Sequence, residues 1–133
     1  MCPVCASPMM IVELQGVEVD HCPACRGTWF DSGELELVAE IAGIEPERLR
    51  GVLLPEPGAR AGTRRCPRCG RRMQPATVGP REPVHIDRCP DGDGVWLDAG
   101  ELASVVRNYH EGDLGKLAEF FGDMFRSELE HGR

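Results

Sequence analysis

The chain has 133 residues and a formal net charge of −7, a length that suits one domain or two very small ones. Aromatic residues make up only 5% of it, whereas 16 glycines and 11 prolines indicate many turns. Halves of this size are marginally stable by apolar burial alone, so we expect another source of stability, and the negative charge argues against broad nucleic-acid binding.

The chain contains 7 cysteines, an odd number that fits a disulfide framework poorly. Its opening residues, Met1–Pro3, lack the charged and apolar regions of a signal peptide. No apolar run approaches the roughly 18 residues that a membrane helix needs. We therefore expect a cytoplasmic protein with no membrane partner, whose reduced cysteines bind metal.

One pattern occurs twice. The first copy, residues 1–42, contains the strings CPVC, CPAC and WFDSGEL, and the second, residues 65–110, contains CPRC, CPDG and WLDAGEL. Val19-Asp20 matches Ile86-Asp87, which places three additional residues in the first hairpin of the second copy. The repetition predicts that the two copies have equivalent structures.

Each copy is predicted to be a hairpin followed by a helix. In the first copy, Met10–Val19 is typical of two strands with a turn at Gln15-Gly16, and Thr28–Phe30 of a short third strand. Asp31 then caps a helix, with Glu34 three positions later to complete a capping box. The apolar stripe of this helix consists of Leu35, Val38, Ala39 and Ala42, widened by Leu37 and Ile41.

The second copy repeats this order after a linker, residues 43–64, in which Pro46–Leu54 is expected to form a short helix. Val95–Leu97 is its short strand, and Asp98 and Glu101 repeat the capping pair. The apolar stripe of the second helix is Leu102, Val105, Val106 and Tyr109.

The last segment, residues 111–133, is amphipathic, with Leu114, Leu117, Ala118, Phe121, Met124 and Phe125 near one face. Such a helix either docks on the domain or serves as a dimerisation or partner surface. The predicted fold class is therefore a small, metal-stabilised α+β fold. It comprises two tandem zinc ribbons, each followed by a capped helix, and a C-terminal amphipathic helix.

Four cysteines in the first copy have the spacing of a complete metal site: Cys2, Cys5, Cys22 and Cys25. Two C-x2-C turns from the ends of a hairpin form a tetrahedron of thiolates, which suits zinc, with iron as the chemical alternative. A site saturated with sulfur has no position for water or substrate, so we expect a structural role.

The second copy supplies three cysteines, Cys66, Cys69 and Cys89, because Gly92 stands where the first copy has Cys25. Asp93 is our first choice for the fourth ligand, followed by His85 and Asp91. Water is a further alternative, and so is a site that has lost its metal. We predict two zinc ions per chain and no catalytic residues. His21, beside Cys22, is expected to be a surface residue or a neighbour of the ligands.

The complete motif is C-P-x-C, a spacer, then C-P-x-C-x-G-x-W-hydrophobic-D-x-G-E-L. It resembles the bacterial zinc-ribbon family named after transcription factor IIB. It runs from Cys2 to Leu35 and again, with the departure at Gly92, from Cys66 to Leu102. The resemblance implies a ribbon fold and zinc at the first four cysteines. Family members often carry a histidine just after the fourth cysteine, the place that Asp93 occupies here. It implies no activity.

Three functions remain open. The first is a non-enzymatic module that binds a protein partner or itself, through the C-terminal segment. The second is nucleic-acid binding through residues 60–88, where eight arginines and two acidic residues give a net charge of +6, against −13 for the remainder. The third is a hydrolase with an open second zinc site, for which Glu101 or Asp98 would have to act as the general base.

Overall fold

The computed structural model describes residues 1–14, 16–45, 47, 58, 60–79, 83–101, 104 and 105. The predicted C-terminal helix lies outside these residues, as do the predicted linker helix apart from Glu47 and most of the second copy's helix. The division of the chain into four segments likewise stays a prediction. No helix among the described residues has the length and apolarity needed to cross a membrane.

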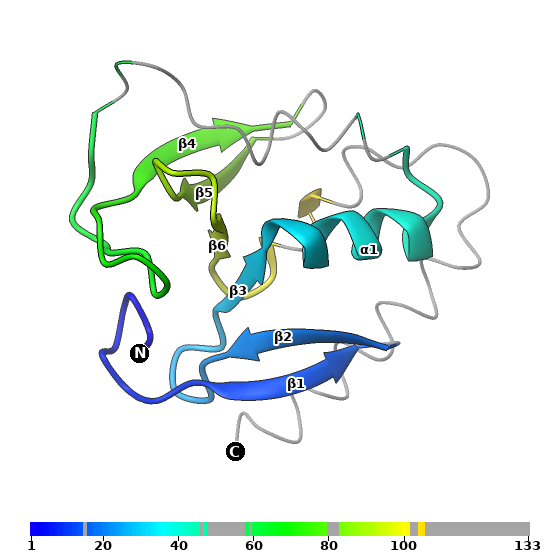
Figure 1. Ribbon diagram of the computed structural model, residues 1–133, viewed down its shortest axis with the longest axis horizontal. Helices are drawn as coiled ribbons and strands as arrows, with labels where there is room; N and C mark the ends of the chain where they lie inside the picture. The colour runs from blue at the N-terminus through cyan, green and yellow to red at the C-terminus, as the bar shows by residue number, and fades with distance from the viewer. Residues whose placement is uncertain are drawn as a thin grey trace.

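The two copies share one six-stranded antiparallel sheet, in the order β1-β2-β3-β6-β5-β4 (Figure 1). The strands are β1 (Met10–Leu14), β2 (Val17–His21), β3 (Thr28–Asp31), β4 (Gln74–Val78), β5 (Val84–Arg88) and β6 (Gly94–Leu97). The predicted hairpins are therefore present. The second has the longer turn, because Leu14 pairs with Val17 whereas Val78 pairs with Val84.

An approximate two-fold axis passes through the centre of the sheet, between β3 and β6. Trp29 pairs with Trp96, the residue at the equivalent position of the second copy. On either side, Thr28 pairs with Leu97 and Phe30 with Val95, an exchange of equivalent positions. The two copies therefore associate as the subunits of a symmetric dimer do, although one chain supplies both.

The helix α1 (Ser32–Ala42) begins and ends as the sequence predicts for a capped helix. The Asp31 backbone N–H donates to Glu34 Oε2 at 3.0 Å, which is one half of the capping box. At the other end Gly43 has φ +73°, and the N–H of Ile44 donates to the Ala39 carbonyl, closing the helix in a Schellman turn. Leu37, expected to widen the apolar face, is instead 46% exposed.

The second copy departs from the first where its helix begins. Gly100 has φ +82° and lies in a turn whose Glu101 N–H donates to the Asp98 carbonyl, whereas the equivalent Gly33 is helical. Only residues 101, 104 and 105 are helical in the described part of this segment. The two capping sequences are thus followed by different backbone conformations, a helix after Asp31 and a turn after Asp98.

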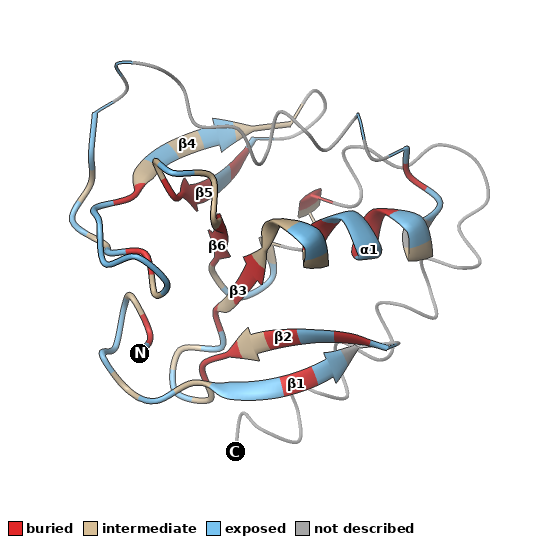
Figure 2. Ribbon diagram, in the orientation of Figure 1, coloured by how far each residue is buried: buried red, intermediate tan, exposed pale blue. Residues whose placement is uncertain are grey.

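Side chains alternate between the two faces of the sheet and form two separate cores. Phe30, Val95 and Leu97 face α1 and pack with its buried residues Leu35, Val38 and Ala39. Trp29 and Trp96 lie in the other core with Met73 and the buried cysteines of both copies. As Figure 2 shows, β6 is buried throughout and β3 has no exposed residue, whereas β1 and β4 are exposed along much of their length.

Candidate metal centres

The first centre gathers the four cysteines that the sequence singled out. The Sγ atoms of Cys2, Cys5, Cys22 and Cys25 all lie within 4.8 Å of one another. The distance from Cys2 Sγ to Cys25 Sγ is 3.7 Å. A tetrahedral zinc with bonds of about 2.3 Å to sulfur separates its ligands by about 3.8 Å. The cluster therefore fits one zinc ion.

The turns that carry these cysteines are built to receive a metal ion. The backbone N–H groups of Val4 and Cys5 both donate to Cys2 Sγ at 3.3 Å, which orients this ligand atom. Ala6 and Arg26, each directly after the second cysteine of its pair, have positive φ values of 56° and 65°. These two residues close the turns, because the N–H of Ala6 donates to the Cys2 carbonyl and that of Arg26 to the Cys22 carbonyl.

The second centre is completed by a carboxylate. Cys66, Cys69, Cys89 and Asp93 form a group with all four ligand atoms within 4.8 Å. Asp93 Oδ2 lies 3.4 Å from Cys89 Sγ and 3.9 Å from Cys66 Sγ. Zinc bonds of about 2.0 to 2.2 Å to oxygen and 2.3 Å to sulfur give a ligand separation of about 3.6 Å. Three thiolates and one carboxylate are thus placed as zinc requires.

A shorter turn explains how Asp93 can be the fourth ligand, although Gly92 occupies the position equivalent to Cys25 and Asp93 comes one residue later. In three of the turns the closing hydrogen bond spans four residues, as from the Gly70 N–H to the Cys66 carbonyl. In the fourth it spans three, from the Gly92 N–H to the Cys89 carbonyl, and Gly92 itself has φ +78°. The left-handed residue therefore comes one position earlier, and Asp93 lies at the ligand position.

The other candidate ligands have different partners. His85 contacts Thr77 Oγ1 through Nδ1, and Asp91 accepts from Arg71 at 2.6 Å. His21 is 5% exposed and contacts Thr28 Oγ1, so of the two expected positions, at the surface or beside the ligands, the surface position was wrong. Its ring is buried because β2 lies between β1 and β3, and it belongs to neither metal-ligating group of the described residues.

The electrostatics of both clusters favour a cation. Burial, reinforced by the neighbouring thiols, raises the pKa of Cys25 to about 12, and it does the same for Cys89. Because the thiols lie so close together, several thiolates can coexist only with a positive charge between them. Zinc binding must therefore displace protons from these cysteines.

Three arginines of the +6 segment, Arg64, Arg68 and Arg71, bind carboxylates of this chain, an arrangement that the sequence analysis missed. Arg68 donates to both carboxylate oxygens of Asp31 at 2.9 Å and also contacts Asp20. In the second copy, Arg64 bridges Asp87 and Asp98 at 3.0 and 3.1 Å. The four acceptors occupy equivalent positions in the two copies, Asp20 with Asp87 and Asp31 with Asp98. This recurrence was the sequence signal from which the ion pairs could have been expected.

The tryptophans connect these ion pairs to the buried core. Trp29 Nε1 donates to Asp31 Oδ1 at 2.8 Å, and Trp96 Nε1 donates to Asp98 Oδ1 at 3.1 Å. The Arg68 guanidinium holds the pKa of Asp31 below its ordinary value. The W-x-D motif therefore positions one carboxylate to accept from an indole and an arginine together.

A six-stranded sheet that carries two clusters of sulfur-rich ligands, each at the turns of a hairpin, defines a small zinc-ribbon protein with two metal centres. The sequence matches the transcription factor zinc-finger family over residues 1–41 and 65–108, and the chain belongs to that family. The two matched segments correspond to the two copies, and the family supports zinc as the metal. No curated protein and no solved structure matches the chain.

Proposed function

We propose that the chain is a non-enzymatic interaction module whose two zinc ions hold the shared sheet in shape, with Asp93 as the fourth ligand of the second ion. The observation that carries this proposal is the number of protein ligands: each centre has four. A catalytic zinc keeps one coordination position for water or substrate. Neither cluster leaves such a position, so zinc serves folding here.

The residues that could act as a general base support the same proposal. Asp98 accepts from both Arg64 and Trp96, so both of its oxygens have other partners. Burial raises the pKa of Glu101, whose carboxylate also accepts the Asp98 backbone N–H. The ion pair with Arg64 thus accounts for the Asp98 side chain, and the Asp98 backbone N–H binds the Glu101 carboxylate.

Nucleic-acid binding loses its support for a similar reason. Arg64, Arg68 and Arg71 form ion pairs with Asp98, Asp31 and Asp91 respectively, and Arg88 is only 4% exposed. Arginines that neutralise carboxylates of their own chain add little to binding of phosphates. Three of the eight arginines in the +6 segment therefore neutralise carboxylates of their own chain, which weakens the case for phosphate binding.

The outer edge of β1 is the surface that best supports an interaction role. Ile11 and Met10 on this strand are 71% and 41% exposed, and no described strand pairs with its outer edge. At the opposite end of the sheet β4 contains Pro75, which has no N–H, and the preceding chain donates from Gly62 to the Met73 carbonyl. One edge is therefore protected and the other is open to another strand.

Replacing Ile11 with lysine is expected to weaken self-association or partner binding through β1, because charge on an edge strand opposes pairing. Light scattering over a concentration series gives the mass of the chain, and we expect a mass that rises with concentration only when Ile11 is present. Leu37→Lys is the matched control, since Leu37 is similarly apolar and exposed but lies on α1. Identical curves for Ile11→Lys and the unaltered chain would exclude β1. Truncation before residue 113 tests the C-terminal segment separately.

Asp93→Ala is expected to lower the zinc content from two ions per chain to one, because three thiolates then remain at the second centre. Native mass spectrometry with elemental analysis measures this directly. Asp91→Ala is the control, as it removes a neighbouring carboxylate that binds Arg71. Retention of two zinc ions by the Asp93 variant would show that another group completes the site.

A further inference from the structure

We propose that Arg68 is a positioning residue that couples the second zinc centre to the first ribbon, so that each centre binds zinc more tightly when the other is occupied. The proposal rests on the assignment of Asp93 as the fourth ligand. It concerns what the second ion does for the remainder of the chain.

The backbone of Arg68 belongs to the second metal centre. The residue lies in the turn Cys66-Pro67-Arg68-Cys69, between two zinc ligands. Its backbone N–H donates to Cys66 Sγ at 3.3 Å. Because a zinc ion would hold both cysteines, it would also hold the backbone from which the Arg68 side chain extends.

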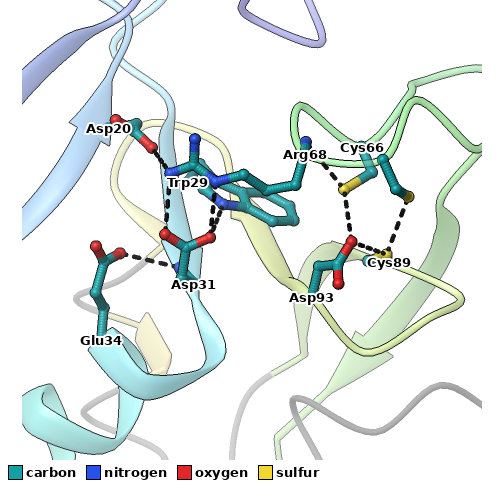
Figure 3. A network of polar contacts seen from close by, with 9 residues as sticks. Asp20, Trp29, Asp31, Glu34, Cys66, Arg68, Cys89 and Asp93 are labelled. Carbon is teal, nitrogen blue, oxygen red and sulfur yellow. Dashed lines mark hydrogen bonds and ion pairs between the residues drawn. The ribbon is translucent and has the colours of Figure 1, made fainter.

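The other end of Arg68 is bound to the first copy. Its guanidinium forms a two-pronged ion pair with Asp31, through Nε to Oδ1 and a terminal nitrogen to Oδ2, and it also contacts Asp20 (Figure 3). This fork geometry is specific to arginine. The second centre thus reaches across the sheet to carboxylates on β2 and β3 of the first ribbon.

Asp31 connects Arg68 to the core and to the helix of the first copy. It accepts from the indole of Trp29, which is buried in the core that also holds Cys2 and Cys22. It also stands at the N-terminus of α1, where its backbone N–H donates to Glu34. A change at Arg68 therefore bears on the packing around two ligands of the first centre.

The first copy has a different residue at the position of Arg68. Val4 occupies the position equivalent to Arg68 and cannot form an ion pair. The equivalent carboxylates, Asp87 and Asp98, are instead bound by Arg64, which lies outside the metal-binding turns. Arg68 therefore links a metal turn of the second copy to carboxylates of the first, and thermodynamics requires the resulting coupling to be reciprocal.

The expected coupling is modest. Arg68 is 44% exposed, so solvent screens its ion pairs and limits what they contribute. Site-to-site coupling in proteins is typically about 5- to 150-fold in affinity, and we expect about 5-fold here.

Four proteins test the proposal: the unaltered chain, Arg68→Ala, Asp93→Ala and the double variant. Each is titrated with cadmium and a competing chelator while ¹¹³Cd NMR follows each centre, since four sulfurs and three sulfurs with a carboxylate give distinct signals. We expect each single substitution to weaken the first centre about 5-fold, and the double variant to weaken it no further. Arg68→Lys should restore part of the affinity, because it keeps the charge but not the fork.

The control is Arg71→Ala, which breaks an ion pair with Asp91 inside the second copy. It should leave the affinity of the first centre unchanged. Additive losses in the double variant, or an Asp93→Ala protein that binds one metal ion with unaltered affinity, would overturn the coupling and leave the zinc-module function intact. Two metal ions bound to Asp93→Ala would instead refute the ligand assignment.

Discussion

Exhaustive chelation, which removes zinc from both centres, is expected to unfold both copies together, and Cys22→Ala is expected to destabilise the first copy. Structural zinc contributes an apparent 10 to 16 kcal/mol, roughly, to the folding of small zinc domains at neutral pH. The whole stability of a typical domain is about 5 to 15 kcal/mol. Because β3 pairs with β6 along the full length of both strands, the two copies are expected to unfold in one transition once both ions are lost.

Tryptophan fluorescence measures this loss at both copies, since Trp29 and Trp96 are fully buried and would become exposed to water. Ala24→Ser is the matched control: it lies in the same turn as Cys22, between Cys22 and Cys25, but its side chain is exposed. The control should keep two zinc ions and a buried fluorescence spectrum. A chain that stays folded with no bound metal would contradict the structural role of zinc.

The elements that the sequence predicted well are those whose signals are local. The C-P-x-C turns, the Asp31–Glu34 capping pair and the hairpins each depend on residues within a few positions of one another. Duplication strengthened each signal, because the same pattern in register twice is unlikely to be accidental. The placement of Asp93 beside three cysteines was likewise within reach, since a carboxylate has the required chemistry.

What the sequence could not supply was the relation between the copies. Alternating apolar residues show that Trp29 and Phe30 face opposite sides of a strand, but not which strand lies beside it. The two copies were therefore expected in tandem, and the continuous sheet came from the structure. The Gly92 turn, which depends on a backbone angle rather than on residue type, was equally inaccessible.

The arginines were misleading for a physical reason. A run of guanidinium groups has the same composition whether it faces phosphate or the chain's own carboxylates. Only the fold brings Arg68 to Asp31, across 37 positions of sequence. The matching of Asp20 with Asp87, visible from the repeat, was the one indication that an acidic pair recurs at this place.

Gly27→Ala is expected to destabilise the chain by about 3 kcal/mol, because the centre of the sheet has no room for a methyl group. A Cβ at Gly27 would overlap the Trp96 ring at Cζ2, and one at Gly94 would lie 2.8 Å from Trp29 Cζ2 and overlap the Phe30 carbonyl. Each tryptophan thus packs against the glycine of the opposite copy, which gives a reason for the G-x-W motif in both. Urea unfolding measures the change in free energy of unfolding.

Gly33→Ala is the matched control, since a Cβ there meets nothing within 4 Å and the residue is helical. It should stabilise the chain by about 0.5 to 1 kcal/mol through its effect on the unfolded state. If the crossed packing is the cause, Gly27→Ala and Trp96→Phe should be non-additive, because the smaller ring makes room for the methyl group. Zinc content should stay at two ions throughout. Equal stabilities for Gly27→Ala and Gly33→Ala would mean that the tryptophans do not lock the copies together.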